Sequence, residues 1–157
     1  MDQNDEESVN GMLGTESHII LRNPAFSSRE KVTLKKIRAF PLEEDFRSAF
    51  DRERNERGIT DVECYQRAQI DRRLFWSIFH RAGYKPKKRT AIALILTLKP
   101  DLRLMDDLLN RLGYCLTHSD RADVVIEACL SKKIFRIEDV NSILSSMELP
   151  VLGSKLD

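Results

Sequence analysis

From Pro41 onward, apolar positions recur every three or four residues, the spacing of one face of an α-helix. Residues that start or stop helices separate the runs: Thr60 with Glu63 three residues later, Asp71 and Asp101 are predicted N-caps, and glycines follow several runs. Short linkers favour one compact all-α domain. The pattern predicts about seven helices, over residues 42–57, 60–68, 71–81, 87–98, 102–112, 119–133 and 137–147.

The first predicted helix is bounded by Pro41, which suits a first turn because its ring already holds a helical φ. Three acidic residues follow at 43–45, where negative charge favours the positive end of the helix dipole. Leu42 and Phe46 are predicted to share the apolar face, so the helix is expected to begin at Leu42.

The predicted helix over residues 87–98 is apolar nearly all round, unlike its neighbours. A helix that lacks a polar face is typical of a buried central element. Lys99 and Pro100 are expected to end it, since the residue before a proline is pushed out of the helical region.

The first forty residues differ in character from the rest. Residues 1–15 are acidic and polar, which predicts a disordered tail. The runs 17–22 and 31–37 permit a small hairpin, while Ser27 and Glu30 would instead cap a helix from Arg29 to Phe40. We favour helix for the second run, and divide the chain into residues 1–40, a tail with short linker elements, and 41–153, the helical domain.

The net charge of +1 hides a strong local pattern. Residues 60–100 hold nine Lys or Arg and three Asp or Glu, which gives +6, whereas residues 101–157 hold seven and ten, which gives −3. A locally basic face is what contact with nucleic-acid phosphates requires, although an ordinary solvated face has the same composition. No apolar run is long enough to span a membrane and no signal peptide is apparent, so a soluble cytoplasmic protein is expected.

Catalytic and metal-binding patterns are weak. Cys64, Cys115 and Cys129 are each set in an apolar helical pattern, which predicts buried reduced thiols rather than disulfides or a metal site. His118 and Ser119 adjoin Asp120, but neighbours in sequence seldom meet in triad geometry, and a cap explains Ser119 better. We expect no enzyme activity, cofactor, metal or small-molecule substrate.

The helices predicted at 60–68 and 71–81 are short and joined by a tight turn, which is the order of a helix-turn-helix. Arg72 and Arg73 would open the second helix, whose first residues read base edges; arginine offers two donors to guanine. Phe75 and Ile78 would anchor this helix in the core. Lys85 in the loop that follows, and Lys87, Lys88 and Arg89 at the start of the next helix, would contact the DNA backbone.

The segments IDRRLF, YKPKKRTA, GY-x-L-x-HS and a terminal P-x-LG resemble the helical module often found at the C-terminus of bacterial macrodomain proteins. That module is described as similar to Xre or lambda-repressor-type helix-turn-helix domains, and the resemblance covers residues 42–153. It implies a repressor-type fold and binding to double-stranded DNA. The macrodomain, which processes ADP-ribose, lies outside the module, so its chemistry is not implied.

Three positions depart from the pattern of these families. Asp61 stands where repressor-type domains commonly place a glutamine that holds a phosphate, and Trp76 and Phe79 stand where the module is usually polar or basic. Trp76 and Phe79 are three apart on one helix and could form an apolar patch for a protein partner. They could equally pack inward, or touch bases, which makes Trp76 a third candidate for base contact.

The leading hypothesis is therefore a non-enzymatic, regulatory helix-turn-helix protein that contacts DNA through a basic face. The alternative is a protein-interaction adaptor or homodimerisation module of a bacterial stress or defence system, which keeps the fold without reading bases.

Overall fold

The computed structural model describes residues 31–153, and within that range the chain forms eight α-helices and no strand. The chain divides into two units, residues 1–43 and 44–157, which we treat separately. The described part of the first unit holds one helix, α3 (Leu34–Ala39). It is capped by Thr33, whose hydroxyl accepts a hydrogen bond from the Lys36 N–H. The second apolar run is thus helical, while the predicted cap at Ser27 lies outside the described residues.

The second unit contains seven helices, which confirms the all-α prediction for the described part of the chain. Thr60 and Glu63 form the predicted capping box, and Asp71, Asp101 and Asp120 cap the helices that follow them. The helices are α4 (Phe46–Glu56), α5 (Asp61–Arg67), α6 (Arg72–His80), α7 (Lys88–Leu96), α8 (Leu102–Arg111), α9 (Arg121–Ser131) and α10 (Ile137–Ser146).

The prediction that the first helix of this unit begins at Leu42 is wrong, because α4 begins at Phe46. Asp45 has an extended backbone and its carboxylate accepts the Ser48 N–H at 2.9 Å, so it is the N-cap rather than a residue of the first turn. Leu42 is 90% exposed, and the buried face of α4 starts only at Phe46. The N-cap hydrogen bond of Asp45 sets the start of α4, and Pro41 does not begin a helix.

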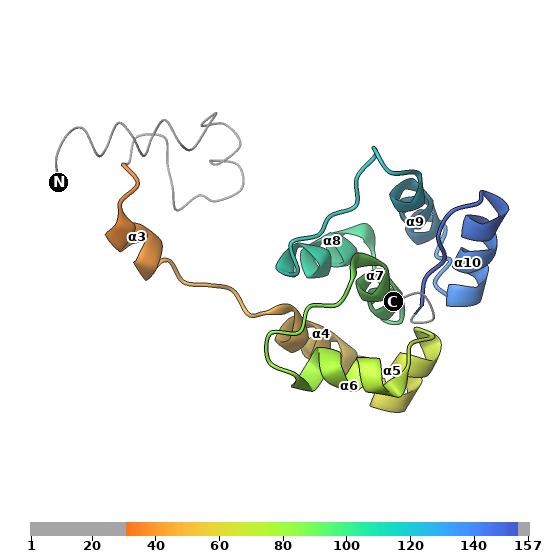
Figure 1. Ribbon diagram of the computed structural model, residues 1–157, viewed down its shortest axis with the longest axis horizontal. Helices are drawn as coiled ribbons and strands as arrows, with labels where there is room; N and C mark the ends of the chain where they lie inside the picture. Colours follow the sequence, from red (N-terminus) through yellow and green to blue (C-terminus); the bar gives the residue numbers. More distant parts are fainter. Residues whose placement is uncertain (1–30, 154–157) are drawn as a thin grey trace. The chain divides into compact units, whose positions relative to one another are not determined.

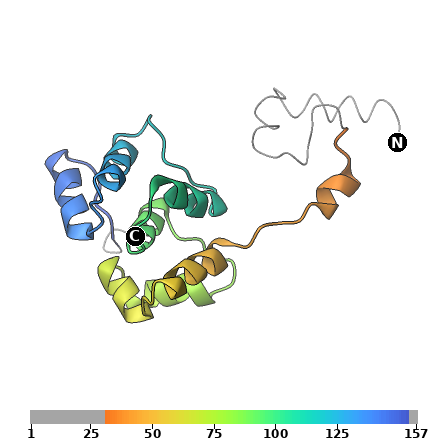
Figure 2. The same ribbon diagram turned by 180° about the vertical axis from the view of Figure 1, so that it is seen from behind.

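Helix α7 occupies the centre of this unit (Figure 1), as its composition predicted. Every residue from Thr90 to Leu98 is buried, including a threonine at each end of the apolar stretch. Helices α4, α5 and α6 lie on one side of α7 and α9 and α10 on the other, in both views (Figures 1 and 2). Helix α8 lies beside α7 and packs against α4, α7 and α9. Each outer helix contributes its apolar stripe to one continuous core around α7.

Five of the seven helices end in the same way. In each, the residue directly after the C-cap has a positive φ. The backbone N–H of the next residue then donates to a carbonyl in the last turn of the helix. Glycine supplies that φ after α4 and α8 at Gly58 and Gly113, but Gln69, Lys133 and Glu148 adopt it after α5, α9 and α10. The donor residue is apolar or aromatic each time and packs back on the core: Ile59, Ile70, Tyr114, Ile134 and Leu149.

The segment after α10 returns to the turn that precedes α6. Asn141 exchanges two hydrogen bonds with Leu152, of 2.7 and 3.0 Å, which fixes this segment along α10. Next to it, a Cβ added to Gly153 would lie 3.2 Å from the Gln69 carbonyl oxygen, so the close approach suits glycine. The Gln69 side-chain amide also donates to Glu138 at 2.9 Å. The turn before α6 is therefore packed against α10.

The N-cap of α4 gives the first testable expectation. The Ser48 backbone N–H lowers the pKa of Asp45 in the folded protein, so its cap stabilises the fold above the unfolded pKa and is lost as pH falls through the folded one. Asp45→Ala should reduce the free energy of unfolding by about 1 kcal/mol at pH 7. Urea denaturation from pH 7 to pH 3 should show that difference shrinking.

Asp45→Asn is the matched control, because asparagine caps as well as aspartate and does not titrate. Its unfolding free energy should stay near that of the original chain at pH 7. If Asp45→Ala lost the same stability at pH 3 as at pH 7, the charged cap would not be the cause.

Candidate nucleic-acid interface

Helices α5 and α6 are joined by four residues, 68–71, whose geometry is set on both sides. The Ile70 N–H donates to the Tyr65 carbonyl, and the Asp71 carboxylate accepts the Arg73 N–H at 2.7 Å. Ile70 is buried, which ties the turn to the core. These contacts fix the point where α6 begins, and with it the positions of Arg72 and Arg73.

The inner face of α6 carries three apolar side chains. Phe75 and Ile78 are buried, as predicted, and Phe79 is partly buried against the same core. The Phe79 ring centroid lies 4.6 Å from that of Phe75 and 5.3 Å from that of Phe50 on α4. Phe79 thus belongs to an aromatic cluster between α6 and α4 rather than to the outer surface.

The outer face of α6 carries Arg72, Arg73, Trp76 and His80, all of them exposed. The Trp76 side chain is 59% exposed, and its ring centroid lies 5.3 Å from the His80 ring one turn later. Arg72 and Arg73 make no ion pair within the described residues, so their charges are open to a ligand. The structure therefore separates the two aromatic residues of the predicted patch: Trp76 faces out and Phe79 faces in.

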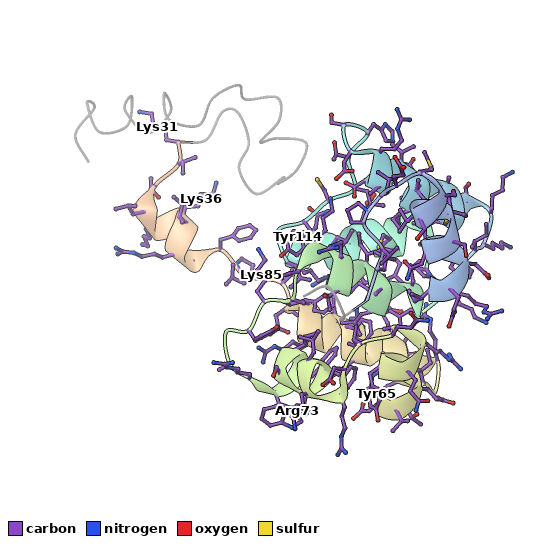
Figure 3. The ribbon with its side chains drawn as sticks, turned by 45° about the vertical axis from the view of Figure 1, so that its right-hand side comes forward. Lys31, Lys36, Tyr65, Arg73, Lys85 and Tyr114 are labelled. Atoms are coloured by element: carbon purple, nitrogen blue, oxygen red, sulfur yellow. The ribbon has the colours of Figure 1, made fainter. Side chains whose placement is uncertain are left out.

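Of the four basic residues predicted to meet a DNA backbone, Lys85 and Lys87 lie in the loop from α6 to α7, and Lys88 and Arg89 begin α7. They differ in their surroundings. Lys85 is exposed and its Nζ lies 4.5 Å from the centroid of the Tyr114 ring, while the Tyr114 hydroxyl donates to the Pro86 carbonyl at 2.9 Å. Lys87 is exposed and Arg89 is half-buried. Figure 3 shows Lys85 beside Tyr114, and Arg73 on α6 lower in the view.

Lys88 is held by the fold. Its Nζ lies 2.6 Å from a carboxylate oxygen of Asp123 on α9, and Asp123 is only 3% exposed. The same oxygen accepts the Thr117 N–H at 2.9 Å. A buried carboxylate needs such partners, because removal of one would leave an uncompensated charge. Lys88 therefore joins α7 to α9, and its charge is already neutralised before any ligand arrives.

Asp61, which stands where repressor-type domains commonly place a phosphate-holding glutamine, also forms an ion pair. Its carboxylate lies 2.7 Å from a guanidinium nitrogen of Arg54 on α4, whose side chain is only 12% exposed. Arg54 bonds to Asp51 and to the Ile59 carbonyl as well. The start of α5 therefore carries a neutralised pair, which weakens its repulsion of a nearby phosphate.

The explanation of Ser119 as a helix cap is wrong, because Asp120 is the N-cap of α9. The His118 ring bonds to Glu127 at 2.7 Å, and the Asp120 carboxylate accepts the Ala122 N–H as the cap of α9. The Ser119 N–H donates to the Thr117 hydroxyl. These contacts serve a turn and a helix cap.

The prediction that the three cysteines are buried is wrong for Cys115, which is exposed in the segment between α8 and α9. Cys64 and Cys129 are buried as predicted. Burial raises the pKa of the Cys64 thiol to about 11, and its sulfur lies 3.6 Å from the Thr97 hydroxyl. Residue 115 follows the end of α8, so the helical pattern did not apply to it. Among the described residues, no group of three metal-ligating side chains gathers.

Sequence reasoning missed two features near this surface. His80 follows Trp76 by four residues, a spacing that would have placed the two rings together on one helix face. Arg67, Lys99 and Arg136 meet around one cavity, although they lie far apart in the chain. No local pattern identifies that second group.

No family model, curated protein or solved structure matches this chain. Within the described residues, no helix is both long enough and apolar enough to cross a bilayer. The functional argument therefore rests on the geometry of the described residues.

The two faces of α6 predict a large loss of stability for truncation of Phe79 and a small one for truncation of Trp76. Phe79→Ala removes a ring from the core cluster and should lower the free energy of unfolding by roughly 2 to 3 kcal/mol. Trp76→Ala removes an exposed ring and should change it by less than about 1 kcal/mol. Urea denaturation followed by circular dichroism measures both, and similar losses for the two variants would contradict the assigned faces.

Proposed function

We propose that this protein is a non-enzymatic helix-turn-helix DNA-binding protein in which α5 and α6 form the motif and α6 is the helix that enters the major groove. The observation that carries the proposal is the outer face of α6. Its first turn presents Arg72 and Arg73, which are exposed and unpaired among the described residues. In a helix-turn-helix, the N-terminal residues of the second helix are those that reach base edges.

The dimensions and charges around α6 support this proposal. An α-helix with its side chains is about 10 to 12 Å across, which the major groove, about 12 Å wide, admits. Lys85 and Lys87 follow the C-terminal end of α6 and are exposed, so they suit phosphate contacts beyond the helix. Lys88 is excluded from this role by its bond to Asp123. The ion pair of Asp61 with Arg54 weakens the repulsion between the Asp61 carboxylate and a DNA phosphate near the start of α5.

Trp76 is part of the same surface. An exposed indole next to arginines can contact a thymine methyl or stack on a base, and its ring already lies against His80. We assign it to the DNA-contacting face, together with Arg72 and Arg73, and we leave Phe79 to the core.

The proposal predicts salt-dependent binding to duplex DNA. Arg72→Gln with Arg73→Gln should weaken binding to a mixed-sequence duplex by about tenfold or more, since a hydrogen bond to a charged group contributes about 1.5 to 3 kcal/mol. Lys85→Ala with Lys87→Ala should reduce the slope of log affinity against log salt by roughly 2, because each phosphate contact contributes about 0.9. Fluorescence anisotropy at several salt concentrations measures both.

Arg103→Gln with Arg121→Gln is the matched control, because these exposed arginines stand in the first turns of α8 and α9. Equal weakening by the control would mean that α6 has no special role. No duplex binding by the unaltered chain at about 50 mM salt would overturn the proposal.

A second candidate function, self-association, is favoured by the 59% exposure of Trp76. A large exposed aromatic ring is enriched where proteins meet. Sedimentation velocity should then show a dimer that Trp76→Ala converts to monomer, while Leu102→Ala, at another exposed apolar side chain, leaves it intact. A monomer at all protein concentrations without DNA would remove this candidate and leave Trp76 to the DNA-contacting face.

A further inference from the structure

A cavity of about 370 Å³ lies where the C-terminal ends of α5 and α7 meet the N-terminal end of α10. Three cationic side chains line it, one from each of these places: Arg67, Lys99 and Arg136. Its apolar lining comes from Leu96, Phe135 and Ile137. None of these residues belongs to the outer face of α6 or to the α6–α7 loop.

The positive charges of this cavity are only partly balanced. Arg67 and Lys99 make no ion pair within the described residues, and the Arg136 Nε lies 3.8 Å from Glu138, beyond hydrogen-bond distance. The Glu138 backbone N–H and the Gln69 amide lower the pKa of the Glu138 carboxyl, which keeps it ionised. Three cations against one carboxylate leave the lining with a charge of +2.

The start of α10 borders the cavity as well. Arg136 is its N-cap and makes no side-chain cap hydrogen bond, while Glu138 and Asp139 in the first turn offset the positive end of the helix dipole. The attraction for an anion therefore comes from the cationic side chains, and guanidinium groups match phosphate oxygens in pairs.

The rest of the lining suits an organic body attached to that phosphate. Phe135 is half-buried against the core, and Leu96 and Ile137 are buried beside it. A charge of +2 matches a phosphate monoester, which carries about −2 at neutral pH. We propose that the cavity binds a small organic phosphate, with Arg67, Lys99 and Arg136 holding its phosphate group and the half-buried Phe135 ring contacting its body.

This site does not depend on the DNA-binding proposal, although it borders the same motif. Arg67 is the last residue of α5, and Gln69 in the following turn bonds to Glu138 at the cavity. A ligand held here would contact the start of α10 and Arg67, which directly precedes the segment that positions α6.

The test uses the full chain and adenosine 5′-monophosphate as the probe in isothermal titration calorimetry. We expect saturable one-to-one binding, about tenfold or more weaker after Arg67→Gln with Arg136→Gln. Arg103→Gln with Arg121→Gln removes the same charge elsewhere and should change the affinity by less than about twofold. Adenosine should not bind measurably, because it lacks the phosphate, and inorganic phosphate should bind more weakly than the nucleotide. Thermal unfolding checks that both double variants remain folded.

Three outcomes would overturn the site. The first is no saturable nucleotide binding by the unaltered chain up to about 5 mM. The second is equal weakening by the two double variants, which would mean that only net charge matters. The third is loss of duplex affinity by Arg67→Gln with Arg136→Gln in a protein that binds no nucleotide, which would assign these residues to the DNA backbone. Nucleotide binding by a protein that binds no duplex would support the site and remove the DNA-binding proposal alone.

Discussion

The burial of α7 on all sides is the constraint on which the rest of this structure depends. Its residues from Thr90 to Leu98 have no contact with water beyond a few per cent of their surface, so protein must cover the whole circumference. That requirement explains why the other helices of this unit each turn an apolar stripe toward one core. At the N-terminal end of α7, the bond from Lys88 to the buried Asp123 joins this helix to α9.

The same constraint divides α6 into two faces with separate roles. Phe75, Ile78 and Phe79 complete the covering of the core, and the aromatic contacts with Phe50 and Tyr65 hold the helix at one rotation about its axis. Once that rotation is set, Arg72 and Arg73 must face outward. The packing of α6 therefore explains why both arginines are exposed, and it leaves their guanidinium groups accessible to a ligand.

Local signals in the sequence predicted most of the fold. Side-chain caps at Thr60, Asp71 and Asp101 and glycines after several helices act within a few residues, so one sequence is enough to read them. Spacing alone could not decide which way Trp76 and Phe79 face, since both lie near the edge of the apolar stripe. The partners of Lys88 and the cavity around Arg67 depend on contacts between distant segments, which no local pattern records.

The hydrogen bond from Gln69 to Glu138 joins positions 69 residues apart in the chain. During synthesis, α5 and α6 leave the ribosome well before α10 exists, and domains fold as their parts become available. The turn that sets the start of α6 therefore gains its contacts with Glu138 and Gly153 only after α10 and the segment that follows it have been synthesised. The contacts that fix the start of α6 are thus completed late in the synthesis of this unit.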